Sequence, residues 1–129
     1  MYEMKPEFYI GVESIDNEHK RLFEITDEIY QLMMDPYTPD KYDNILSVLE
    51  QLKEYTRLHF ENEEKYMESI AYKYMFSQKV DHAAFIEKLE NIDLDEIDTD
   101  QDKAIFNLLN FLNDWLVTHI LEKDLLIVQ

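Results

Sequence analysis

Residues 14–34 read SIDNEHKRLFEITDEIYQLMM and carry a clear helical pattern. Apolar side chains recur there every three or four positions, at Leu22, Phe23, Ile25, Ile29, Leu32 and Met33. That spacing puts them on one face of an α-helix, and such a face needs a partner surface to bury it. Ser14 is the predicted N-cap of this helix. Asp35-Pro36 ends it at Met34, because the residue before a proline avoids helical dihedral angles.

Three further segments are predicted to be helical. The ranges are Thr38 to Met67, Tyr72 to Leu89 and Thr99 to Lys123. Thr38-Pro39 is typical of an N-cap followed by proline at the first helical position. Thr99 with Asp102 resembles a capping box at the start of the last helix. Between the last two helices, residues from Asn91 to Asp98 are predicted to form an acidic loop.

The composition favours a few long helices over many short strands. Among 129 residues there are one glycine and three prolines, so the chain has few positions suited to sharp turns. Helices with short connections pack as neighbours in opposite directions. We therefore expect an all-α fold, an antiparallel up-down-up-down four-helix bundle with residues 1–10 as an extended N-terminal arm. The length predicts a single domain over residues 1–129.

The net charge of −17 excludes several classes of partner. So negative a surface repels phosphate backbones and anionic lipid, which argues against nucleic acid and membrane binding. The chain has no cysteine and so no disulfide, iron–sulfur cluster or thiol nucleophile. A leader segment and a membrane-spanning apolar run are not apparent, so we expect a cytoplasmic protein, either a monomer or a weak homo-oligomer.

Four histidines are the strongest chemical signal. They are His19, His59, His82 and His119, one within each predicted long helix and each among apolar neighbours. A lone histidine in such a setting is more often a hydrogen-bonded core residue than a ligand. Four of them on four helices instead favour a metal site, because facing helices of a bundle build such sites in the core.

Two carboxylates accompany the histidines. Glu63 follows His59 by four residues, a rotation of about 40° on a helix, so both side chains point the same way. This spacing makes Glu63 a good bridging ligand, although alone it could be a solvated acid. Asp124 follows His119 by five residues, a rotation of about 140°. A regular helix would turn Asp124 away from the site, unless the helix end unwinds or carries a π-type turn.

The joint pattern resembles bacterial hemerythrins. The resemblance rests on VESID before His19, on the segment HFENEE from His59 to Glu64, on His82 with Phe85, and on WLVTHI from Trp115 to Ile120 with Asp124. It covers nearly the whole chain, from Gly11 to Asp124. Each piece alone is weak, whereas the combination is specific.

The resemblance implies a site of two non-haem iron ions. By position, His19 and His59 would hold the iron that is left open for dioxygen. His82 and His119 would hold the other iron, and Glu63 and Asp124 would bridge both. Trp115, Leu116 and Ile120 match the positions that form the apolar dioxygen pocket in hemerythrins.

One position departs from the family pattern. Hemerythrins have a fifth histidine, four residues before the third-helix histidine, and this chain has Gln78 there. Gln78 lies one helical turn from His82 and points the same way. An amide oxygen is a harder and weaker ligand for iron(II) than imidazole. Three outcomes stay open: the amide ligates iron, a small ligand fills the vacancy, or the second iron binds weakly.

The resemblance therefore implies a protein that binds dioxygen reversibly, as a carrier, store or sensor, and is not an enzyme. The first alternative is a di-iron peroxidase or oxidase that uses an open position at Gln78. The second is a degenerate metal-binding scaffold. The expected partner is dioxygen or another small ligand. No nucleotide-binding or hydride-cofactor motif is present, so an enzyme would need electrons from outside.

Overall fold

The structure, a computed structural model, describes residues 2–128, and these residues form helices and their connections with no β-strand. The prediction of an all-helical chain is confirmed for this range. The elements are η1 (Pro6–Phe8), α1 (Glu13–Met34), α2 (Tyr42–Ser69), α3 (Met75–Glu90), α4 (Leu94–Thr99), α5 (Gln101–Glu122) and η2 (Asp124–Val128), where η is a 3-10 helix. Among these helices, none is long and apolar enough to cross a membrane.

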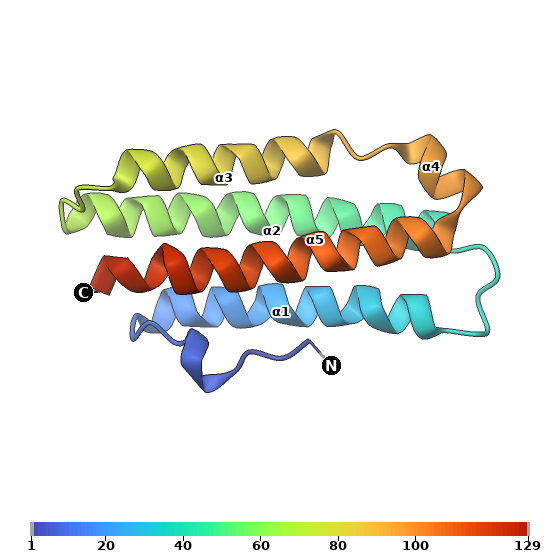
Figure 1. Cartoon of the computed structure of the whole chain (residues 1–129), viewed down its shortest axis with the longest axis horizontal. Coiled ribbons are helices and arrows are strands. Elements are labelled where there is room, and N and C mark those ends of the chain that lie inside the picture. The colour runs from blue at the N-terminus through green and yellow to red at the C-terminus, as the bar shows by residue number, and fades with distance from the viewer. Residues whose placement is uncertain (1, 129) are drawn as a thin grey trace.

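The four long helices α1, α2, α3 and α5 lie side by side in Figure 1. Helix α1 packs against α2 and α5, and α2 also packs against α3. The start of α1, the connection from α2 to α3 and the end of α5 all lie at the left end in Figure 1. Segments far apart in the sequence therefore meet at this end of the bundle.

The apolar face of α1 enters the core as its spacing predicts. Leu22, Phe23, Ile25 and Ile29 are each at most 2% exposed. Leu32 and Met33 are partly buried and pack against the same core. Burying one such side chain contributes about 1.5–3 kcal/mol relative to leaving it exposed, so this face is the main attachment of α1.

The first two predicted helix starts need correction. Helix α1 begins at Glu13 with Val12 as N-cap, so Ser14 is already helical. Helix α2 begins at Tyr42, not near Thr38. The Thr38 hydroxyl donates to Asp35 Oδ2 at 2.7 Å and so is engaged in the preceding turn.

The acidic loop and the last helix start were also predicted wrongly. Residues 94–99 form α4, because Asp93 caps it by accepting hydrogen bonds from two backbone amides. Thr99 is the last residue of α4, and α5 begins at Gln101. The cap of α5 is Asp100, whose carboxylate accepts from the Lys103 backbone amide at 3.2 Å. The third predicted helix is shifted by a few residues, since α3 begins at Met75.

The segment before α1 folds back on that helix. It includes η1 and is not extended throughout. Phe8 stacks on Phe23 with ring centroids 5.4 Å apart. Asp16 accepts hydrogen bonds from the backbone amides of Ile10 at 2.8 Å and Gly11 at 3.1 Å. Gly11 has φ +95°, a conformation that side chains rarely adopt, and this allows the reversal.

Candidate metal centre

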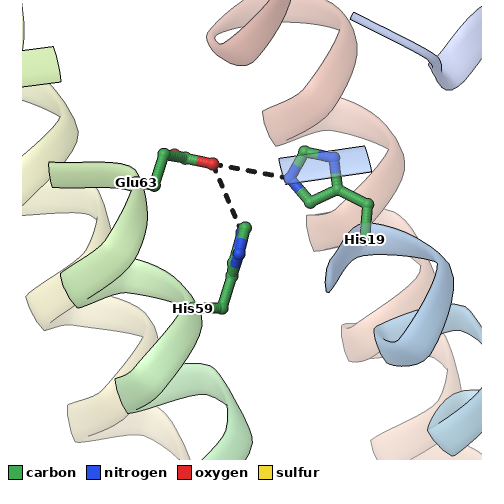
Figure 2. A group of neighbouring side chains, drawn as sticks. All are labelled: His19, His59 and Glu63. Atoms are coloured by element: carbon green, nitrogen blue, oxygen red, sulfur yellow. Dashed lines mark ion pairs between the residues drawn. The ribbon is translucent and has the colours of Figure 1, made fainter. Parts of the chain in front are cut away.

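The four histidines meet around Glu63 at one end of the bundle, each from a different long helix, and all are at most 5% exposed. Glu63 Oε2 lies 3.5 Å from His19 Nε2 and 3.3 Å from His59 Nε2. Glu63 Oε1 lies 3.2 Å from His82 Nε2 and 3.8 Å from His119 Nε2. One carboxylate thus offers one oxygen to each pair of imidazoles. Figure 2 shows Glu63 directed at His19 and His59.

Asp124 joins the cluster because the last helix changes type. Helix α5 ends at Glu122 and η2 begins at Asp124. Asp124 Oδ2 lies 3.1 Å from His19 Nε2, and its Oδ1 lies 3.1 Å from His119 Nε2. The five-residue spacing, unfavourable on a regular helix, is therefore accommodated by the change to a 3-10 helix after Lys123. Asp124 is fully buried.

These side chains form two candidate metal groups that share Glu63. The ligand atoms of His19, His59 and Glu63 lie within 4.8 Å of one another, and so do those of Glu63, His82 and His119. Two histidines and a carboxylate are a ligand set typical of non-haem iron(II). Imidazole and carboxylate both suit iron(II), so the donor chemistry fits that metal.

Unpaired polar atoms support a cation in the cluster. The buried atoms without a hydrogen-bond partner among residues 2–128 are His19 Nδ1 and Nε2, both Glu63 carboxylate oxygens, Gln78 Oε1 and Asp124 Oδ2. Some of them lie within ion-pair distance of a neighbour, but none makes a well-directed hydrogen bond. Leaving a buried polar group unpaired costs about 1–3 kcal/mol. A cation would satisfy the lone pairs of Glu63 and Asp124 together.

The carboxylates and histidines of the cluster shift one another's pKa values toward the charged forms. Burial opposes charging of Glu63, but the four histidines outweigh it and hold the Glu63 pKa well below its usual range. Burial also opposes protonation of His59, but Glu18 and Glu63 raise its pKa to about 9. Asp124 and Glu63 likewise outweigh burial and raise the pKa of His119 to about 9. The site therefore attracts positive charge, as protons or as metal.

Two further carboxylates orient histidines from outside the cluster. Glu18 Oε1 lies 2.9 Å from His59 Nδ1, and its Oε2 accepts from Asn62 Nδ2 at 2.7 Å. Glu64 Oε2 lies 2.9 Å from His82 Nδ1. Such partners fix the ring so that Nε2 faces the centre. The sequence analysis assigned neither role, although both acids are direct neighbours of predicted ligands.

Gln78 lies in the cluster as its spacing predicts. It is 1% exposed, and its side-chain Nε2 donates to Asp124 Oδ1 at 3.1 Å. The structure thus brings Gln78 to the same oxygen of Asp124 that faces His119.

The three predicted pocket residues lie on α5. Leu116 is 3% exposed and Ile120 is 1% exposed, so both belong to the buried face of the helix. Trp115 is partly buried and stacks on the His119 ring, with centroids 4.3 Å apart and an interplanar angle of 11°. The aromatic ring of Trp115 therefore covers His119, on the His82–His119 side of the cluster.

Comparison with known proteins agrees with the geometry. The chain matches the Hemerythrin HHE cation binding domain over residues 10–129. It is 47% identical over 124 residues to a bacteriohemerythrin of Clostridium acetobutylicum, with 96% of each chain covered.

More distant relatives include both bacterial and animal proteins. A bacteriohemerythrin of Pseudomonas paraeruginosa is 31% identical, over 88% of this chain and 71% of its own length. A hemerythrin of Phascolopsis gouldii is 31% identical, over 95% of this chain and 87% of its own length. A buried set of four histidines and two carboxylates, on a helical chain that matches this domain from residue 10 onward, leads to one conclusion: the chain belongs to the hemerythrin HHE cation-binding family.

Proposed function

We propose that residues 1–129 form a single hemerythrin domain that holds two non-haem iron ions and binds dioxygen reversibly, as a carrier, store or sensor. The observation that carries the proposal is the sharing of Glu63 between two pairs of histidines. A single metal would need one such pair, and two pairs on one carboxylate suit two metals. Family membership supports iron as the metal and dioxygen as the ligand.

The proposed scaffold is an antiparallel up-down-up-down four-helix bundle. The contacts of α1 with α2 and α5, and of α2 with α3, support it. The chain also returns to the same end of the bundle after α2 and after α5, and this supports the same topology (Figure 1). This arrangement lets four distant segments each contribute one histidine to the same centre.

In the proposed site, His19 and His59 would hold one iron and His82 and His119 the other. Glu63 and Asp124 would serve both irons, and their charges would offset part of the positive charge of the metals. The iron pair, when bound, supplies the electrons that dioxygen binding requires. The rings of His59 and His82 are held in place by Glu18 and Glu64, so their Nε2 atoms are oriented before metal enters.

Apolar surface on α5 keeps water away from the proposed site. Leu116 and Ile120 are buried, and Trp115 covers the ring of His119. A dry lining disfavours proton delivery to the bound ligand, and this is the condition for its release without reaction. Trp115, Leu116 and Ile120 are therefore proposed as the dioxygen pocket.

Elemental analysis after anaerobic iron loading tests the metal assignment. We expect two irons per chain, and one or fewer would contradict a di-iron site. Repeated exposure to dioxygen and then to argon tests the ligand assignment. The expected result is a visible spectrum that returns to its starting form in each cycle, without accumulation of hydrogen peroxide.

A second candidate function is that of a di-iron peroxidase or oxidase. The hydrogen bond of Gln78 to Asp124 favours it, because an amide engaged in this way leaves the His82–His119 side with two nitrogen donors. An outside reductant would then supply electrons for each turnover. Net consumption of dioxygen during the argon cycles would support this function, and a protein that takes up no iron would instead be a degenerate scaffold.

A further inference from the structure

We infer that Gln78 acts as a hydrogen-bond donor to Asp124 and not as a metal ligand, so that the metal position of His82 and His119 keeps an open coordination site for a small exogenous ligand. The inference rests on the proposed function, because it requires two metal positions. It adds a second place where a small ligand binds, beside the one on the His19–His59 side.

The orientation of the Gln78 amide follows from its partner. Its Nε2 lies 3.1 Å from Asp124 Oδ1, and an ionised carboxylate can only accept hydrogen bonds. The NH2 group must therefore face Asp124, and a planar amide nitrogen has no lone pair to offer a metal. Asp124 Oδ1 is also 3.1 Å from His119 Nε2, so Gln78 holds the carboxylate oxygen that serves the second metal position.

A neighbouring contact keeps the two elements together at this point. Lys123 Nζ donates to Ser77 Oγ at 3.2 Å and pairs with Asp81 Oδ2 at 3.4 Å. Ser77 and Asp81 flank Gln78 on α3, and Lys123 directly precedes Asp124. These contacts therefore join α3 to the residue before Asp124, next to the Gln78–Asp124 hydrogen bond.

A count of the donor atoms shows which ligands the metal position of His82 and His119 lacks. All four histidines of the chain are used, two in each candidate group. Two histidines with Glu63 and Asp124 still leave coordination positions open on iron(II). Gln78 Oε1 also lies in the cluster, where it is buried and has no hydrogen-bond partner. As an acceptor, it would stabilise a ligand that carries a hydrogen, such as water.

Substitutions at Gln78 separate a donor from a ligand. Gln78→Glu keeps an oxygen that could bind metal but replaces the NH2 donor with an acceptor facing Asp124. Gln78→Leu removes both functions. If Gln78 is a donor, both variants release iron to a chelator faster than wild type, by about 10- to 100-fold, as for other partners of metal ligands. Slower release from Gln78→Glu than from wild type would overturn the inference, because it would show that an oxygen at this position ligates iron.

A matched variant controls for the added charge. Gln51→Glu makes the same substitution at an exposed position of α2, away from the cluster. It should release iron at the wild-type rate. Thermal melting of each metal-free variant, monitored by circular dichroism, verifies that the variant is folded before iron is added.

Titration with azide, a small anion, measures directly how many coordination positions are open. After loading and oxidation, the wild-type protein should bind two equivalents of azide by spectroscopic titration, and Gln78→His, which supplies a further imidazole, should bind one. One equivalent in the wild type that holds two irons would overturn this inference and leave the di-iron proposal intact. Fewer than two irons in the wild type would overturn both.

Discussion

The end of the bundle that contains the histidines differs from the opposite end in how its buried polar atoms are paired. At the far end, Lys41 is 7% exposed, but its Nζ donates to the Met33 carbonyl at 3.1 Å and its backbone amide donates to Gln101 Oε1 at 2.8 Å. At the histidine end, atoms of His19, Glu63, Gln78 and Asp124 are buried without partners. The polar groups of Lys41 are hydrogen-bonded within the protein, whereas several buried polar atoms at the histidine end could be paired by a bound ligand.

The difference indicates how stability and function are divided along the bundle. Unpaired buried groups each cost about 1–3 kcal/mol, so the histidine end weakens the metal-free fold. The apolar side chains of the remaining core offset that cost. Substitutions at the two ends should therefore have separable effects on metal binding and on stability.

The largest expected effect is on metal binding after Glu63→Gln. This change keeps the side-chain volume but removes the charge that faces all four histidines. Breaking a buried charge pair costs about 3–5 kcal/mol, which corresponds to more than about 100-fold in affinity. Elemental analysis should show that iron falls from two per chain to one or none.

Glu61→Gln is the control, because Glu61 is 64% exposed on the same helix. It should retain both irons. Equal iron content in Glu63→Gln and wild type would contradict the assignment of metal binding to the histidine end of the bundle.

The next largest effect is on stability after Leu109→Ala. Leu109 is 1% exposed, and it lies ten residues before His119 on α5, about 15 Å along the helix. Deleting a buried leucine side chain costs about 2–5 kcal/mol. Urea unfolding should show that loss, while iron release to a chelator stays at the wild-type rate. A large increase in release would show that the two ends are coupled.

The pH dependence of the metal-free protein provides a third test. The pKa of His59 and His119 is raised to about 9 in the folded chain, from about 6.5 in an unfolded one. Their contribution to stability is therefore complete below about pH 6.5 and is lost as the pH rises through about 9. We expect the free energy of unfolding to fall by a few kcal/mol across this window.

Urea unfolding in the presence of a chelator, at several values between pH 6 and 9.5, measures this change. The iron-loaded protein is the comparison, since its histidines are held neutral by metal and its profile should be flatter. A metal-free protein that becomes more stable at high pH would contradict the assigned charges.

The smallest expected effect is that of Lys123→Met. Lys123 and its partner Asp81 are 40% and 35% exposed, so their pairing contributes under about 1 kcal/mol to stability. Because Lys123 holds the residue next to Asp124, iron release should still increase, by about two- to tenfold, less than for groups that touch a ligand. Lys65→Met removes an exposed pair elsewhere and should leave the release rate unchanged. Equal rates in both variants would mean that Lys123 does not position Asp124.

Much of this architecture could be predicted because helical periodicity is a local property. The face of Leu22 and Ile29 was predicted to be buried, and it is. The helix starts were less predictable, since Thr38 and Asp35 bond to each other within a turn that propensity does not reveal. Likewise, the sequence pattern predicted Thr99 as the cap of the last helix, whereas Asp100 caps it.

The convergence of the candidate ligands was predictable from one histidine per helix. The outer roles of Glu18 and Glu64 were not, because an acid next to a candidate ligand in the sequence is usually solvated. The donor role of Gln78 depends on where η2 places Asp124, and the change of helix type after Lys123 is a tertiary effect. Position in the sequence could show that Gln78 points inward, but not which of its two polar atoms faces the cluster.

The order of the candidate ligands along the chain affects how the site is made in the cell. His19 is synthesised first, and Asp124 follows about a hundred residues later, roughly 5 to 20 seconds at ordinary translation rates. Until Asp124 leaves the ribosome, one of the two carboxylates of the proposed site is missing. Metal that needs the complete proposed site would therefore enter late, and it would displace protons from the histidines.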